Sequence, residues 1–331
     1  MTFPIDAVRA QFKALHQPGA KALGRVYFDA PGGTQTCAPA IAAMVAHLES
    51  GTANSGGAFR TSIETDAVSA EAHAAMADLL GGTPDQIAFG PNMTSLTLAV
   101  SRALAASWAE GDEIVLTRLD HDANVAPWLL AARDRGATVR WLDFDPATGR
   151  WNAGDLPALL GPRTRLVALG IASNALGTIN PVAEAIAHVR ARSTASVYVD
   201  AVQSVPHIVT DVAALGADFL ACSPYKFFGP HQGVLWARDA EAVAAYKVRP
   251  AGDEGAHRFE SGTPSFEGQA GVLGTIAYLE WLGAEADPQA NSRRARLVAA
   301  MQAMVGYERG LGERLLAGLT TIPGLKLWGP P

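Results

Sequence analysis

Lys226 is the residue in this sequence with the clearest capacity for covalent chemistry. It lies within Asp218–Pro230, an otherwise apolar segment bounded by turns. Burying an ammonium group is so unfavourable that such a lysine either pairs with an anion or lowers its pKa by up to about 3 to 5 units and becomes a neutral amine. A neutral amine is a nucleophile toward an aldehyde, which makes Lys226 a candidate Schiff-base lysine. The alternative is a lysine whose stem packs on Phe227 and Phe228 while its ammonium group reaches water.

Polar side chains follow five short apolar runs that are predicted to be strands. In mostly parallel sheets, ligands bind beyond the carboxyl ends of the strands, so these side chains are expected to meet at one edge. They are Met93 and Thr94 after residues 87–89, His121 after 113–116, Asn174 after 165–169, Asp200 and Gln203 after 196–199, and Ser223 after 219–221.

This set of side chains matches the needs of one cofactor, pyridoxal 5'-phosphate (PLP). The carboxylate of Asp200 would pair with the pyridinium nitrogen and keep the ring an electron sink, while Lys226 would hold the aldehyde. Lys226, His121 and Asp200 are therefore the expected catalytic residues. Taken singly, Thr94 could be an ordinary helix N-cap and His121 a solvated loop residue. The remaining contacts would be ring stacking by His121, hydrogen bonds to the phenolic oxygen from Asn174 and Gln203, and phosphate binding by Met93, Thr94 and Ser223.

The elements that must position these residues alternate between helix and strand. Strands that alternate with helices of this length predict βαβ units, hence an α/β fold with a mostly parallel sheet covered on both faces. Helices are expected over residues 64–80, 94–106, 125–135 and 182–192, and strands over 87–89, 113–116, 138–142, 165–169, 196–199, 219–221 and 233–236.

The two ends of the chain are expected to lie outside this alternating region. Residues 1 to about 22 predict an amphipathic helix, followed by a short strand at 26–28, a helix at 39–48 and a glycine-rich surface loop at 51–60. Residues 281 to about 318 predict helix, and 326–328 predict the start of a strand. A second domain is therefore expected to start near residue 281 and to be incomplete at residue 331.

Composition excludes several classes of protein. The chain has 331 residues, 49% hydrophobic and 18% charged, which is enough for one large core and a smaller unit. The net charge is -6 with scattered Lys and Arg, so neither nucleic acid nor a membrane is expected as a partner. No run of about 18 apolar residues and no signal peptide is present, which predicts a cytoplasmic protein. Two cysteines and eight histidines show no metal-ligand spacing, so no metal site is expected.

Five segments together resemble the class V aminotransferase family of PLP enzymes, and within it the cysteine desulfurase-like branch. Asp120–Trp128 resembles the family's Glu-His-x-Ala-Asn-x-x-Pro-Trp segment. Ser173–Gly177 is similar to its Asn-containing loop, and Val199–Gln203 to its Asp-x-x-Gln element. Ser223–Pro230 matches its Ser-x-x-Lys-x-x-Gly-Pro run, and Arg258–Pro264 its Phe-Glu-x-Gly-Thr-Pro segment. The resemblance covers residues 26–280.

The resemblance implies a fold-type I enzyme, a transferase or lyase, that acts on a small amino acid. It implies a three-layer PLP-binding large domain at 26–280, the start of a small α/β C-terminal domain at 281–331, and an N-terminal segment, 1–25, that packs with the small domain. The family also implies a homodimer with active sites at the subunit interface, in which Thr263 reaches the phosphate bound by the partner. After the substrate amine displaces it, Lys226 would move the Cα proton as general base.

Three departures from the desulfurase pattern leave the reaction open. Family desulfurases use a cysteine on a C-terminal loop as nucleophile and an arginine in the same region for the substrate carboxylate, and this sequence stops before either. Cys37 and Cys222 are expected to be core residues. Tyr225 stands where many desulfurases carry a histidine. The alternatives are a class V aminotransferase, an isopenicillin N epimerase-like enzyme, or a non-catalytic relative; the substrate and any sulfur acceptor stay undetermined.

Overall fold

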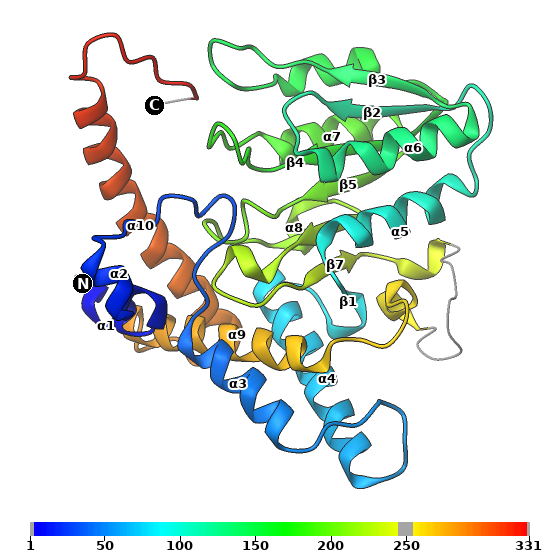
Figure 1. Cartoon of the computed structure of the whole chain (residues 1–331). Coiled ribbons are helices and arrows are strands. Elements are labelled where there is room, and N and C mark those ends of the chain that lie inside the picture. Colours follow the sequence, from blue (N-terminus) through cyan, green and yellow to red (C-terminus); the bar gives the residue numbers. More distant parts are fainter. Residues whose placement is uncertain (1–2, 244–253, 330–331) are drawn as a thin grey trace.

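A seven-stranded sheet forms the centre of the computed structural model, which describes residues 3–243 and 254–329 (Figure 1). The strand order is β1-β7-β6-β5-β4-β2-β3. The strands are β1 (Ile87–Gly90), β2 (Glu113–Thr117), β3 (Thr138–Leu142), β4 (Thr164–Gly170), β5 (Ser196–Asp200), β6 (Phe219–Cys222) and β7 (Gly233–Ala237). Each of these strands includes the run of residues that the sequence predicts.

Six of the described strands point in one direction. Strands β2 to β6 pair in parallel with their neighbours, whereas β7 is antiparallel to β6. Because β1 is in turn antiparallel to β7, the second reversal restores the common direction. The carboxyl ends of β1, β2, β4, β5 and β6 therefore lie at the same edge of the sheet, which is where ligands bind in such folds.

Helices cover both faces of the sheet, as predicted. Along β5, Val197 and Val199 enter one hydrophobic cluster and Tyr198 enters the other, because successive side chains of a strand point to opposite faces. Helices α5 and α6 cover the face of Tyr198, and α7 lies on the opposite face (Figure 1). The described α-helices are α1 (Ile5–Ala10), α2 (Pro18–Ala22), α3 (Ala38–Glu49), α4 (Arg60–Leu80), α5 (Met93–Ala105), α6 (Ala126–Arg135), α7 (Val182–Arg192), α8 (Val212–Leu215), α9 (Phe266–Ala286) and α10 (Arg293–Leu319).

Three predictions near the ends of the chain were wrong. The expected helix over residues 1–22 is two short helices with a 3-10 turn, Lys13–His16, between them. Gln17 precedes a proline and is extended, which ends the helical path. Residues 26–28 and 326–328 form no strand, because no described strand pairs with either segment. The helical stretch at 281–318 is divided between α9, which begins earlier, and α10. Among the described helices none is long and apolar enough to span a membrane.

Helix α9 packs closely against α3 through a residue without a side chain. A Cβ atom at Gly274 would overlap the carbonyl oxygen of Pro39 and lie 2.6 Å from the Cα of Ala40. A side chain there would therefore push the two helices apart. Gly310 in α10 is the opposite case, since a Cβ atom there would meet nothing within 4 Å.

Substituting these two glycines should have opposite effects on stability. Gly274→Ala is expected to lower the free energy of unfolding by about 1–3 kcal/mol through overpacking. Gly310→Ala should raise it by about 0.5–1 kcal/mol, because alanine loses less backbone entropy in a helix. Urea unfolding followed by circular dichroism measures both. Equal stability of the two variants would contradict the close contact of α3 and α9.

Candidate active site

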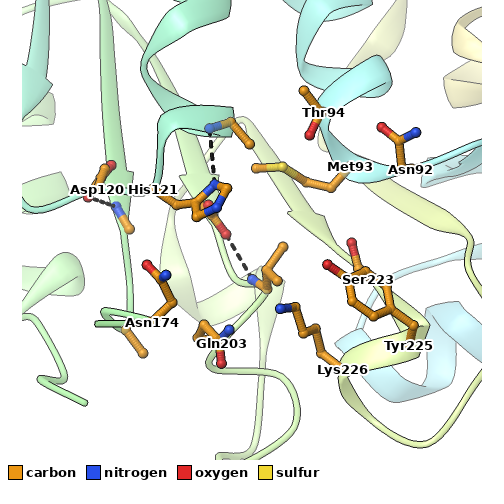
Figure 2. A pocket seen from close by; sticks show the side chains of 15 residues that line it. Asn92, Met93, Thr94, Asp120, His121, Asn174, Gln203, Ser223, Tyr225 and Lys226 are labelled. Atoms are coloured by element: carbon orange, nitrogen blue, oxygen red, sulfur yellow. Dashed lines mark hydrogen bonds between the residues drawn. The ribbon is translucent and has the colours of Figure 1, made fainter. Parts of the chain in front are cut away.

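One pocket opens at the edge where the parallel strands end, and it gathers most of the residues that the sequence singles out (Figure 2). Every predicted cofactor-binding residue except Thr263 lines it. Thr263 is exposed and lies between the 3-10 turn Gly255–Phe259 and α9. The lining residues are Asn92, Met93, Thr94, Asp120, His121, Ala123, Gly170, Ala172, Asn174, Asp200, Val202, Gln203, Ser223, Tyr225 and Lys226.

Asp200 ends β5 and places a carboxylate at the floor of the pocket. The residue is buried, and its Oδ1 accepts a hydrogen bond of 2.9 Å from the N–H of Val202. Burial raises the pKa of Asp200, while the Val202 N–H and the charge of Lys226 oppose this rise. A cationic group placed against Asp200 would stabilise its charged form, so the position suits the pairing with a ring nitrogen that the sequence predicts.

Lys226 ends a 3-10 turn, Pro224–Lys226, and its amine enters the same pocket (Figure 2). Its Nζ donates a hydrogen bond to the carbonyl oxygen of Pro31 and lies 4.8 Å from the centroid of the Tyr225 ring. Burial lowers the pKa of Lys226, and the charge of Asp200 partly opposes this effect. The lowered pKa favours the neutral amine, the form that attacks an aldehyde.

The Pro31 carbonyl is a contact that sequence reasoning missed. The amide Nε2 of Gln203 also donates to it, at 2.9 Å, so one carbonyl oxygen orients two side chains of the pocket. Pro31 belongs to the turn Asp29–Thr34, in which Gly32 donates to the carbonyl of Asp29 at 2.8 Å. The glycine-rich turn was visible in the sequence, but nothing in it indicated a contact with Lys226.

The backbone beside Lys226 is strained and clamped. Phe228 has φ 73°, in the left-handed region that large side chains rarely adopt. Thr34 holds this conformation, because its Oγ1 accepts from the Phe228 N–H at 2.8 Å and its own N–H donates to the carbonyl of Tyr225 at 3.0 Å. The two hydrogen bonds of Thr34 therefore fix the backbone on both sides of Lys226.

The N-terminus of α5 forms a cradle suited to a phosphate. Its cap is Asn92 rather than Thr94, since the Asn92 Oδ1 accepts from the N–H of Ser95 at 2.9 Å. The first free N–H groups of the helix and the Thr94 hydroxyl thus stay available to an anion. Gly233 on β7 lets the cradle approach the sheet, because a Cβ there would overlap the backbone of Asn92. These donors fit the phosphate of PLP.

His121 follows β2 and stands at the exposed mouth of the pocket. Its Nδ1 accepts a hydrogen bond of 3.1 Å from the N–H of Ala123, so the neutral ring carries its proton on Nε2. This contact holds the imidazole within the group of pocket side chains in Figure 2. Its plane is available for stacking, which is the role predicted from the sequence.

Asp120 is a second carboxylate in the pocket, to which sequence reasoning gave no role. Its Oδ1 accepts from the Thr117 hydroxyl at 2.6 Å and the Gly170 N–H at 3.1 Å, and its Oδ2 accepts from the Asn124 amide at 2.8 Å. Asn124 in turn accepts from the Trp128 indole at 3.1 Å. Asp120 thus joins the ends of β2 and β4. Burial raises its pKa to about 7, and the charge of Asp200 adds to the rise.

Both cysteines are buried and neither lines the pocket. Burial raises the pKa of the Cys37 and Cys222 thiols, so neither is an activated nucleophile. Tyr225 does line the pocket, and burial raises the pKa of its phenol. Its ring stacks on His231 with centroids 4.8 Å apart and planes inclined by 10°. A neutral phenol is a hydrogen-bond donor beside Lys226.

A mostly parallel sheet with a lysine, a buried carboxylate, an imidazole and a phosphate cradle at one edge defines a PLP-dependent enzyme of the α/β transferase fold. Residues 26–328 match the class V aminotransferase family over most of the chain. The chain belongs to the class V aminotransferase family.

Known relatives place the chain beside cysteine desulfurases. It is 31% identical over 354 residues to a cysteine desulfurase of Enterobacter sp., covering 100% of this chain and 81% of that protein. It is 34% identical over 279 residues to a probable cysteine desulfurase of Mycolicibacterium paratuberculosis, covering 78% of this chain but only 37% of that relative.

Solved structures show the same architecture. The apo cysteine desulfurase of Thermococcus onnurineus superposes with a TM-score of 0.84 at 26% identity, covering 100% of this chain and 79% of that one. A lysine-to-alanine mutant of C-DES, with glycine covalently linked to its PLP cofactor, superposes with a TM-score of 0.76 at 25% identity, covering 95% of this chain and 80% of that one.

Replacing Asp120 with asparagine tests how much its hydrogen bonds contribute to the stability of the cofactor-free protein. In Asp120→Asn, the new amide NH2 would face another donor, the side-chain NH2 of Asn124. Asn124 cannot flip its amide, because its oxygen accepts the hydrogen bond from the Trp128 indole. The substitution should therefore lower the free energy of unfolding by about 1–3 kcal/mol. The folded pKa of about 7 lies above that of an unfolded aspartate. The contribution of Asp120 to the stability of the wild type is therefore complete at acid pH and falls as pH rises from about 4 to 7.

Asparagine does not titrate, so the difference in the free energy of unfolding between wild type and Asp120→Asn should become smaller as pH rises from about 4 to 7. Urea unfolding at several pH values measures it, with the exposed Asp122→Asn as control. A deficit that grows with pH would show that the folded pKa of Asp120 is not raised.

Proposed function

We propose that this chain is a PLP-dependent enzyme that acts on a small amino acid with cysteine desulfurase-like chemistry. The observation that carries the proposal is that the amine of Lys226 and the carboxylate of Asp200 enter one pocket beside the free N-terminus of α5. A nucleophilic amine, an acceptor for a ring nitrogen and an anion cradle are the three separate requirements of PLP binding. The relatives at about 30% identity support the desulfurase-like chemistry.

Each side chain of the pocket then has a role. Bound PLP supplies an electron sink for the carbanion at the substrate Cα. Lys226 would hold the cofactor and would serve as general base for the Cα proton at its Nζ, because its lowered pKa keeps more of the amine in the neutral form that can accept a proton. Asp200 would pair with the ring nitrogen and His121 would stack on the ring. The remaining assignments are hydrogen bonds to the ring oxygen from Asn174 and Gln203, and phosphate contacts from Met93, Thr94 and Ser223.

A second candidate is an aminotransferase or an isopenicillin N epimerase-like reaction. The observation that favours it is the burial of Cys37 and Cys222 outside the pocket, since those reactions need no protein thiol. Both reactions use the same PLP site and the same general base. They differ from the desulfurase-like reaction in releasing no sulfur, so the products decide between them. A sulfur acceptor is required only in the first case.

The chain is proposed to act as a homodimer in the cytoplasm, with Thr263 reaching the partner's phosphate. Large apolar side chains that are exposed in the single chain support the dimer, and two free thiols agree with a reducing compartment. Several of these exposed residues fall within 23–63, namely Leu23, Val26, Tyr27, Phe28, Val45, Leu48, Phe59 and Ile63.

The domain division is also a proposal. Residues 26–280 would form the large domain, and 1–25 with 281–331 the small unit. Phe3 stacks on Tyr307 of α10 with centroids 4.4 Å apart, which supports contact between the two ends. Helix α9 passes through residue 280 without a break, so the two units would share a helix.

Sedimentation should report twice the mass of one chain at micromolar concentration. Phe59→Asp, which places a charge among exposed apolar side chains, should shift the protein toward the monomer, because burying an unpaired carboxylate is costly. Asp122→Asn, an exposed change outside that group, serves as control. A monomer in the wild type would contradict the dimer.

Lys226→Ala is the direct test of the enzyme. Wild-type protein mixed with PLP and reduced by borohydride should gain one phosphopyridoxyl group, located on Lys226 by peptide mapping. Lys226→Ala should gain none and should lose about 10³-fold or more of its activity. Lys13→Ala, an exposed lysine, is the matched control.

The products identify the reaction. Sulfide or persulfide released from L-cysteine supports the desulfurase-like reaction, whereas a keto acid or an inverted Cα without sulfur release supports the second candidate. A wild-type chain that binds PLP and converts no amino acid would indicate a non-catalytic relative. Labelling that persists unchanged in Lys226→Ala would refute the role of Lys226.

A further inference from the structure

A cluster of two histidines and a glutamate lies outside the pocket and has no part in the chemistry above. The Nε2 of His73 on α4 is 2.7 Å from the Oε1 of Glu260, and the Nδ1 of His257 is 3.5 Å from the Oε2 of Glu260. The two imidazole rings are 4.5 Å apart. His73 and Glu260 are both buried, so each charge in the cluster depends on the others.

Both ring nitrogens of His73 have hydrogen-bond partners on other segments or turns. Its Nδ1 lies 2.7 Å from the carbonyl oxygen of Ser69 and its Nε2 lies 2.7 Å from the Oε1 of Glu260. The ring is thus held at both ends. Burial by itself would raise the pKa of Glu260, but hydrogen bonds from His257 and His73 hold it at about 2.

The cluster has the ligand types of a metal site, but its contacts are those of an ion pair. The Oε1 of Glu260 also accepts the N–H of Phe89 at 2.8 Å, so two N–H donors already share this atom. The Nε2 of His73, which would have to bind a metal, already lies within hydrogen-bond distance of Glu260. A joint between chain segments accounts for these contacts better than a cation site does.

Glu260 connects the two segments that are assigned to phosphate groups. Phe89 belongs to β1, which leads directly to Asn92 and the cradle at the N-terminus of α5. On the other side, Glu260 precedes Thr263 by three residues, and Thr263 is the residue proposed to reach the partner's phosphate. One carboxylate thus joins α4, β1 and the Thr263 segment.

We propose that His73 and Glu260 are positioning residues that hold the Thr263 segment against β1 and thereby set the affinity of the enzyme for the PLP phosphate. The inference rests on the proposed function, because it assumes that the cradle and Thr263 both bind phosphate. Neither residue lines the pocket, so they act only through the segments that they join. The cluster is therefore a determinant of cofactor retention rather than of chemistry.

The joint should weaken as the solution becomes alkaline. The pKa of His257 is raised by its hydrogen bond to Glu260 against the effect of burial, with Asp85 and Glu254 as the other charges that act on it. A raised imidazole pKa gives stability that is complete below the unfolded value and is lost as pH rises through the folded one. Glu260 stays ionised throughout this range.

The test compares His73→Leu, which removes both hydrogen bonds of the ring, with His73→Gln, which keeps one N–H donor. His188→Leu on α7 is the matched control. PLP dissociation constants are measured at pH 6.5 and 8.5 by absorbance on the full chain. His73→Leu should bind PLP at least tenfold more weakly than wild type, and His73→Gln should be intermediate. Wild type should lose affinity between the two pH values, and His257→Gln, whose side chain does not titrate, should lose less.

Hydrogen exchange supplies a readout that needs no cofactor. The amide of Phe89, which donates to the Glu260 carboxylate, and the amide of Glu260, which donates to the carbonyl of His257 at 2.9 Å, should exchange faster in His73→Leu, but not in His188→Leu. Unchanged PLP affinity in a folded His73→Leu would overturn the positioning role, and unchanged exchange at both amides would overturn the joint. A wild-type chain that binds no PLP would refute the proposed function instead, and exchange alone would then decide on the joint.

Discussion

Two ionisable side chains, Asp200 and Lys226, are removed from water at the same edge of the sheet, and neither would be stable there alone. Their mutual charge partly offsets the burial of both. The Pro31 carbonyl accepts from the amine, and the Val202 N–H donates to the carboxylate. The result is a pocket in which the lowered pKa of Lys226 favours its neutral amine, beside a carboxylate that suits a cationic ring. The chemistry of the site follows from this balance.

The fold brings these groups together through the direction of the strands and through close contacts of the backbone. Because β1 regains the direction of the parallel strands, the cradle of α5 opens at the same edge as Asp200. Gly233 allows the backbone of Asn92 to come against β7. Thr34 holds the left-handed Phe228, so strain next to Lys226 is maintained by a segment from the start of the chain.

Two carboxylates outside the chemical step connect the parts of this site. Asp120 links the ends of β2 and β4, and Glu260 links β1 to the segment of Thr263. Each is buried and hydrogen-bonded by several donors, which makes its network rigid and costly to break. The two networks have opposite effects on the pKa of their carboxyl groups. Burial raises the pKa of Asp120, whereas hydrogen bonds from His257 and His73 lower the pKa of Glu260.

The sequence by itself determined the seven strands, the four longer helices between residues 60 and 240, and the group Lys226, Asp200 and His121, because periodicity and strand ends are local signals and parallel strands share an edge. It did not predict the short helix α8. It did not determine contacts between distant segments. The hydrogen bond from Lys226 to Pro31 spans 195 residues, and that from His73 to Glu260 spans 187. The expected strands at 26–28 and 326–328 were wrong for the same reason, since a strand exists only where tertiary structure provides a partner.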